Sequence, residues 1–179
     1  MTLPQLRRPS PIPLVLLLAL APLACKPKHN DVSTVEEPPA LATVVHTADP
    51  HTAGQLLTGF YPVESNAWRW TAGHFSVALR PPRSAAQNGA TLELKFALPE
   101  AVIGKVGAVS LSASVNGTPL SPEKYTKAGQ YTYSRDVPPS LLNGDSVTVA
   151  FALDKPLPPS PGDQRELGVI ATSIGFEPK

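Results

Sequence analysis

Short stretches in which apolar and polar residues alternate make up most of the sequence from Gly54 to the C-terminus, and they constrain the fold most. Alternation places successive side chains on opposite faces of a strand, so each stretch predicts a strand with one buried face. The chain also contains 22 prolines among 179 residues, which disfavours long helices. These features predict an all-β fold, an antiparallel β-sandwich over residues 54–179.

The predicted strands number about eight to nine and are separated by turn-forming residues. Ala72-Gly73 is predicted to interrupt the strand phase, Asn116-Gly117 to form a type I′ hairpin turn, and Pro99–Gly107 to hold a helical turn. The strands are Gln55–Tyr61, Ala67–Thr71, His74–Arg80, Thr91–Leu98, Ala108–Val115, Thr118–Leu120, Gln130–Val137, Ser146–Leu153 and a last one from about Leu167 to Phe176.

The N-terminus has the pattern of a secretory signal. Arg7 and Arg8 precede an uncharged run from Ile12 to Cys25, which includes a leucine-rich core and ends in small residues. The run is shorter than the roughly 18 apolar residues that a membrane-spanning helix needs, although an uncleaved anchor is the alternative. We therefore predict a signal peptide over residues 1–24.

The segment Ala21-Pro22-Leu23-Ala24-Cys25 resembles the lipobox of bacterial lipoproteins, with Pro22 where that family usually has leucine. The resemblance implies that Cys25 is acylated and becomes the first residue of the mature chain. Because Lys26 rather than aspartate follows, it also implies export to the outer membrane. Each buried CH₂ of an acyl chain adds about 0.8 kcal/mol of membrane binding. We therefore expect a lipid-anchored protein of the bacterial cell envelope, with the membrane as a partner.

Residues 25–53 are polar and rich in proline, which predicts a disordered tether. We interpret His46 and His51 as solvated residues rather than metal ligands. The 15 Lys+Arg of the chain, less Arg7 and Arg8 of the signal, leave 13 against 14 Asp+Glu in the mature chain, a net charge of −1. No basic patch is visible, so nucleic acid is not a predicted partner.

Both tryptophans of the chain lie in the stretch Gly59–Thr71. Trp68 and Trp70 are two residues apart, so on a strand they share one face while Arg69 points to the other. Such a pair could fill the core or, on the outside, stack on a sugar ring. Since the chain has few other aromatic residues, we favour the core.

Four motifs resemble an uncharacterised β-sandwich module that occurs in bacterial cell-envelope proteins and in chains carrying glycosyltransferases. The resemblance covers Gly54 to the C-terminus and implies a jelly-roll-like domain that is compared with carbohydrate-binding modules, without implying an activity. The motifs are Gly59-Phe60-Tyr61-Pro62-Val63-Glu64, Trp68-Arg69-Trp70-Thr71, Val115-Asn116-Gly117 and Asp163-Gln164-Arg165-Glu166-Leu167-Gly168-Val169.

The charged residues of these motifs have a structural interpretation. Arg69 lies between the two tryptophans, and Asp163 and Arg165 precede the last strand. Arginine and carboxylate groups form bidentate pairs with strict geometry, so such pairs would fix the loop Lys155–Gln164. Glu64 is the predicted partner of either arginine.

Three classes of function stay open, and we predict that the protein is not an enzyme. No nucleophile motif, metal-ligand spacing or cofactor loop is recognisable, although Glu64 and Asp163 could form a glycosidase-like carboxylate pair. As a binding module it could hold carbohydrate, with Tyr131, Tyr133 and Arg135 on an exposed face as the hypothetical ligand-binding residues. Alternatively, it binds another envelope protein in a structural role.

Overall fold

The computed structural model describes residues 40–179, which lie within the compact unit Pro38–Lys179. The predicted signal peptide, the predicted acylation site Cys25 and the predicted tether up to residue 39 lie outside the described residues. Within residues 40–179, every helix is too short or too polar to cross a membrane. The described unit has its own core, so we expect it to fold by itself.

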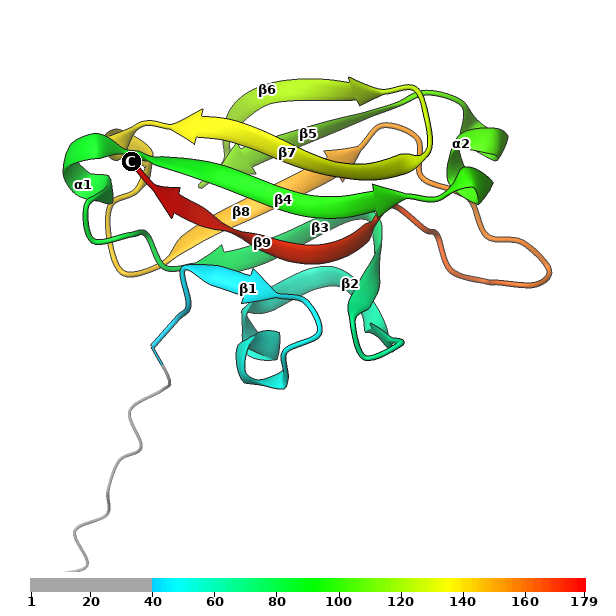
Figure 1. Cartoon of the computed structure of the whole chain (residues 1–179), viewed down its shortest axis with the longest axis horizontal. Helices are drawn as coiled ribbons and strands as arrows, with labels where there is room; N and C mark the ends of the chain where they lie inside the picture. Colours follow the sequence, from blue (N-terminus) through cyan, green and yellow to red (C-terminus); the bar gives the residue numbers. More distant parts are fainter. Residues whose placement is uncertain (1–39) are drawn as a thin grey trace, which may run out of the picture. The chain divides into compact units, whose positions relative to one another are not determined.

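Nine antiparallel strands of the described chain form two layers, with β4, β7 and β9 in one and β5, β6 and β8 in the other (Figure 1). The strand order is β6-β5-β8-β3-β9-β4-β7, with β1 beside β9 and β2 beside β3. This architecture confirms the predicted antiparallel β-sandwich. The strands are β1 (Val44–His46), β2 (Leu56–Glu64), β3 (Trp68–Leu79), β4 (Ala90–Leu98), β5 (Val109–Val115), β6 (Thr118–Tyr125), β7 (Gly129–Val137), β8 (Val147–Leu153) and β9 (Ile170–Pro178).

The short helices lie in the connections between strands. The α-helix α1 (Ala85–Asn88) precedes β4, and α2 (Glu100–Val106) follows it, where the sequence predicts a helical turn. Both end at glycine, Gly89 and Gly107, with positive φ angles of 74° and 73°. Two 3-10 helices, η1 (Pro50–Gln55) and η2 (Pro139–Leu141), each begin with proline, whose φ suits the first helical position.

Strand β3 connects the two layers. Its first residues pair with β9, where Trp70 lies opposite Ile170, and its last residues pair with β8, where His74 lies opposite Ala152. β3 runs without a break from Trp68 to Leu79, so the two strands predicted on either side of Ala72-Gly73 are one. The predicted phase change assumed that the tryptophans point inward, and the structure corrects that assumption below.

The core between the layers is built from phenylalanine, tyrosine and aliphatic side chains. Phe75 of β3 stacks on Phe151 of β8 with ring centroids 4.9 Å apart. Burial of one such side chain stabilises the fold by about 1.5–3 kcal/mol. The largest fully buried side chains are Tyr133, Phe75, Phe96, Phe151, Phe176, Leu79, Leu92, Leu94, Leu98, Leu111, Ile174 and Val45.

The folded part begins before the predicted boundary at residue 54. β1 pairs with β9, and its Val45 is fully buried. Asp49 then caps η1, since its side chain accepts a hydrogen bond of 2.9 Å from the backbone nitrogen of His51. The predicted tether is therefore corrected for residues 44–53. A strand of three residues is too short to show alternation, and its partner lies at the other end of the chain.

Candidate functional site

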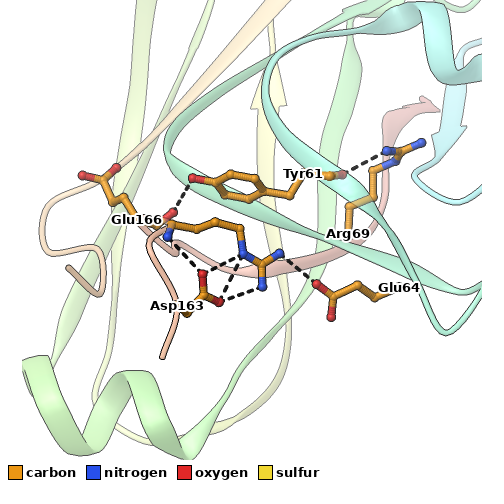
Figure 2. Close-up of polar contacts among 6 residues, drawn as sticks. Tyr61, Glu64, Arg69, Asp163 and Glu166 are labelled. Atoms are coloured by element: carbon orange, nitrogen blue, oxygen red, sulfur yellow. Dashed lines mark hydrogen bonds and ion pairs between the residues drawn. The ribbon is translucent and has the colours of Figure 1, made fainter. Parts of the chain in front are cut away.

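Arg165 is the centre of a charged cluster with Glu64 and Asp163 (Figure 2). Its Nη1 donates a hydrogen bond of 2.9 Å to Oε1 of Glu64. Its Nε and Nη2 donate to the carboxylate of Asp163 at 2.8–3.1 Å. All three side chains are about one third exposed, at 33%, 36% and 34%. The structure thus brings together these three residues from two distant motifs.

The charged cluster ties the loop between β8 and β9 to the sheet. The guanidinium of Arg165 lies 5.2 Å from the ring centroid of Tyr61. The hydroxyl of Tyr61 donates to the backbone oxygen of Glu166 at 2.8 Å (Figure 2). The backbone nitrogen of Gly73 donates to Oε1 of Glu166 at 2.9 Å. Side chains of the motifs therefore hold the loop, as the sequence led us to expect.

The same contacts determine the protonation state of Asp163. Hydrogen bonds from the side chain and backbone of Arg165 lower the pKa of Asp163 to about 2. A general acid must carry its proton near neutral pH, and Asp163 is ionised there. Glu64 and Asp163 both bind the guanidinium of Arg165, so in this arrangement the two carboxylates hold the side chain of Arg165 in place.

Arg69 lies apart from this cluster and forms no ion pair with the described residues. Its Nε donates to the backbone oxygen of Thr47 at 2.6 Å and its Nη1 to that of Tyr61 at 2.9 Å. Of the two arginines predicted as alternative partners of Glu64, Arg165 pairs with it and Arg69 does not, because Glu64 lies opposite Trp68 and so on the other face of β3 from Arg69. Arg69 instead joins β3 to the segment after β1.

Trp68 and Trp70 lie on the solvent side of the sheet rather than between its layers. Trp70 lies opposite Ile170 of β9, which lies opposite Ala97 of β4, and all three are partly exposed. Their neighbour Ala171 is fully buried, so the two sets alternate between faces. Although Trp70 touches the edge of the core, the indoles do not fill it. The interpretation of the tryptophans as core residues is thus corrected.

We call Trp68, Trp70, Ile170 and Ala97 the tryptophan row. The two indole centroids are 6.5 Å apart, with ring planes at 84°. This edge-to-face contact restrains both rings. Because Glu64 lies directly opposite Trp68, the charged cluster borders one end of the row. The row therefore combines an apolar surface about 10 Å wide with polar groups beside it.

The turn between β2 and β3 produces this neighbourhood. Ser65 and Asn66 both have φ near 52°, a left-handed conformation that asparagine tolerates well. The backbone nitrogen of Ala67 donates to the oxygen of Glu64 at 3.1 Å and closes the turn. This tight connection places Glu64 opposite Trp68 at the start of β3.

Tyr131, Tyr133 and Arg135 do not form the exposed face that we expected. They alternate with outward residues as predicted, but the faces are reversed. Tyr133 is fully buried and its hydroxyl donates to the backbone oxygen of Ser121 at 2.8 Å. Arg135 donates to the same oxygen at 2.7 Å and to Glu123 at 2.9 Å. Tyr133 and Arg135 thus join β7 to β6, whereas the hydroxyl of Tyr131 donates to the backbone oxygen of Lys127, in the turn between these strands, at 2.9 Å.

Sequence reasoning missed a groove of about 440 Å³ on the outer face of β3, β5 and β8. Its floor is half-buried serine and alanine, where an exposed sheet usually carries longer side chains. Small residues at outward positions of three strands are the signal that could have revealed it. The register arranges its lining in two rows, Thr58, Ser76, Ala150, Ser114 and Pro119, and His74, Ala152 and Ser112.

The groove offers less for recognition than the tryptophan row. Its lining hydroxyls are partly occupied, since Thr58 and Ser76 hydrogen-bond each other at 2.8 Å. Its one exposed aromatic ring is the imidazole of His74. Within residues 40–179, no three His, Cys, Asp or Glu side chains are grouped to hold a metal ion.

No protein-family model matches this sequence, and no curated protein matches it. Solved structures with a similar fold include a family 36 carbohydrate-binding module in complex with calcium and xylotriose. It is 10% identical over 75% of this chain and 99% of that chain, with a TM-score of 0.43. A family 35 carbohydrate-binding module from Clostridium thermocellum is 15% identical over 75% of this chain and 98% of that chain, with a TM-score of 0.45.

A larger protein shares this likeness over part of its length. The family GH115 4-O-methyl-alpha-glucuronidase BtGH115A is 12% identical over 90% of this chain, with a TM-score of 0.45. The chain spans 19% of the length of that enzyme. At such identities and TM-scores the likeness concerns the β-sandwich fold alone.

Proposed function

We propose that this chain is a lipid-anchored, non-catalytic protein of the bacterial cell envelope that binds carbohydrate on its tryptophan row. One observation carries the proposal: two partly exposed indoles lie on the solvent side of the sheet, restrained by each other and bordered by charged side chains. A pyranose ring has flat apolar faces and a rim of hydroxyls, so it needs aromatic surface with polar groups beside it.

The charged cluster supports a binding role over a catalytic one. A glycosidase needs one carboxyl group that is protonated and one that is ionised. Arg165 binds both Glu64 and Asp163 and lowers the pKa of Asp163 to about 2. Asp163 is therefore not the general acid of such a pair, and its oxygen atoms serve as hydrogen-bond acceptors.

The anchor at Cys25 follows from the lipobox-like segment and the apolar run before it. A tether from Cys25 to the first described residues would place the domain some tens of Å from the membrane, by the square-root scaling of flexible chains. There the domain would reach envelope glycans. The alternative of a protein partner has less support, since Leu57, 48% exposed, is the one large apolar side chain exposed within residues 40–179.

Fluorescence titration of the unit Pro38–Lys179 tests the proposal. Both tryptophans of the chain lie in the tryptophan row, so the indole emission reports on this surface alone. We expect neutral oligosaccharides from a panel of bacterial and plant glycans to shift the emission. Trp68→Ala should weaken binding about tenfold, which is the effect of losing one stacking ring.

Two control variants separate this surface from the alternatives. Ala152→Arg fills the groove and should leave the affinity unchanged, and Leu57→Ala removes the exposed leucine of β2 and should also leave it unchanged. Loss of binding in Ala152→Arg with full binding in Trp68→Ala would assign the ligand to the groove instead. No binding of any glycan in the panel, measured by calorimetry at millimolar concentration, would contradict carbohydrate binding.

A further inference from the structure

The border of the tryptophan row carries more negative than positive charge. Two carboxylates, Glu64 and Asp163, face the single guanidinium of Arg165, which leaves a net charge of about −1 at contact distance. An anionic ligand would thus meet repulsion beside Trp68.

At this border, the groups that remain free to form hydrogen bonds are mainly acceptors. Three of the five N–H groups of Arg165 already donate to carboxylates, and the ring of Tyr61 lies against the guanidinium. Glu64, in contrast, uses only Oε1, and its Oε2 has no partner among residues 40–179. A carboxylate oxygen pairs with hydroxyl or ammonium donors and not with another anion.

We infer that the tryptophan row selects sugars with hydroxyl or amino substituents and rejects sugars that carry carboxylate, sulfate or phosphate groups. The inference rests on the proposed function and specifies its ligand class. Trp68 supplies the stacking surface, and Oε2 of Glu64, on the residue opposite it, accepts from the sugar. An ammonium group gains more than a hydroxyl there because the bond is charge-assisted.

Three matched trisaccharides test the selection on one backbone. They are β-1,4-linked trimers of glucose, glucosamine and glucuronic acid, titrated at slightly acidic pH so that the amines are protonated. We expect the glucosamine trimer to bind at least as tightly as the glucose trimer. The glucuronic acid trimer should bind about tenfold more weakly than the glucose trimer, and added salt should reduce that difference.

Two charge-removing variants identify the group responsible. Glu64→Gln keeps an acceptor for Arg165 and removes the negative charge, so the ratio of glucosamine to glucose affinity should fall about threefold or more. Glu177→Gln removes the same charge at the far end of β9, about 23 Å from Ile170 along the strand, and should preserve the ratio.

The outcomes separate this inference from the proposed function. If no glycan of the panel, these trimers included, binds in a manner that depends on Trp68, the proposed function fails and the inference fails with it. If binding depends on Trp68 but the glucuronic acid trimer binds tightest, only the selection for uncharged and amino sugars is overturned. The same holds if Glu64→Gln and Glu177→Gln change the ratio equally.

Discussion

Two glycines of the motifs are required by close packing of the backbone. Gly59 has φ of 75°, and a Cβ atom there would overlap the carbonyl oxygen of His74 and lie 2.7 Å from Cα of Phe75. A Cβ atom at Gly168 would overlap the carbonyl oxygen of Ala72. Both contacts are with β3, so these glycines allow β2 and the segment before β9 to approach it. The first and last motifs therefore have a structural cause at these positions.

Gly59→Ala should destabilise the domain by about 2 to 5 kcal/mol, since left-handed strain and a backbone overlap act together. Urea denaturation followed by fluorescence measures the change. Gly54→Ala is the matched control, because no atom lies within 4 Å of a Cβ atom there, and its effect should stay within about 0.5 kcal/mol. Equal stability of the two variants would show that β2 relaxes away from β3 at no cost.

At the residue scale, charge complementarity could be predicted and side-chain direction could not. The pairing of Arg165 with Glu64 and Asp163 follows from residue types that attract each other. The direction of Trp68 and Trp70 does not, because a pair at even spacing has the same pattern whether it faces core or solvent. Their neighbours in space, Ile170 and Ala97, come from strands far away in the sequence.

At the scale of elements, alternation located the strands but left their faces and partners open. In β4 and β8 the alternating apolar side chains point inward, as predicted, because burial is what stabilises them. In β7 the tyrosines are inward because their hydroxyls find backbone oxygens, such as that of Ser121 for Tyr133. The sequence did not predict β1, because this short strand depends on its pairing with β9, where Val45 lies opposite Ile174.

The contact between β6 and β7 depends on Arg135. It donates to the backbone oxygens of Ser121 and Pro122 and to Glu123, and its guanidinium lies 4.4 Å from the ring centroid of Tyr133. Arg135→Ala should therefore lower the free energy of unfolding by about 1 to 3 kcal/mol.

Denaturant unfolding measures this loss, and glycan affinity provides the second readout. Lys95→Ala is the control, because the side chain of Lys95 is 56% exposed and its ion pair with Glu93 is long, at 3.8 Å. Its effect should stay within about 0.5 kcal/mol. If Arg135→Ala abolished sugar binding while the fold stayed intact, Arg135 would belong to a ligand site after all.

At the scale of the whole molecule, the proposed arrangement is a sandwich domain attached to a membrane by its N-terminal segment. The sequence predicted the sandwich because about eight to nine regular strands leave few alternatives. The anchor remains a prediction from residues 21–25.

Metabolic labelling with palmitate in a Gram-negative host tests this anchor. The full chain should incorporate label and sediment with membranes, whereas Cys25→Ser should do neither, because no other cysteine exists to accept an acyl chain. Pro22→Leu, which restores the usual lipobox residue, should keep the label. An unlabelled wild-type chain, or a Cys25→Ser variant that stays in the membrane fraction, would contradict acylation.

Strand β2 pairs only with β3 in the described chain, so its other edge is open. Three register shifts along β2 and the missing N–H of Pro62 make that edge uneven. Many copies anchored to one membrane would meet at high density, where straight open edge strands of different molecules pair and form intermolecular sheets. The uneven edge of β2 gives a neighbouring copy no regular ladder to extend, so crowding on a surface would not by itself extend the sheet at this edge.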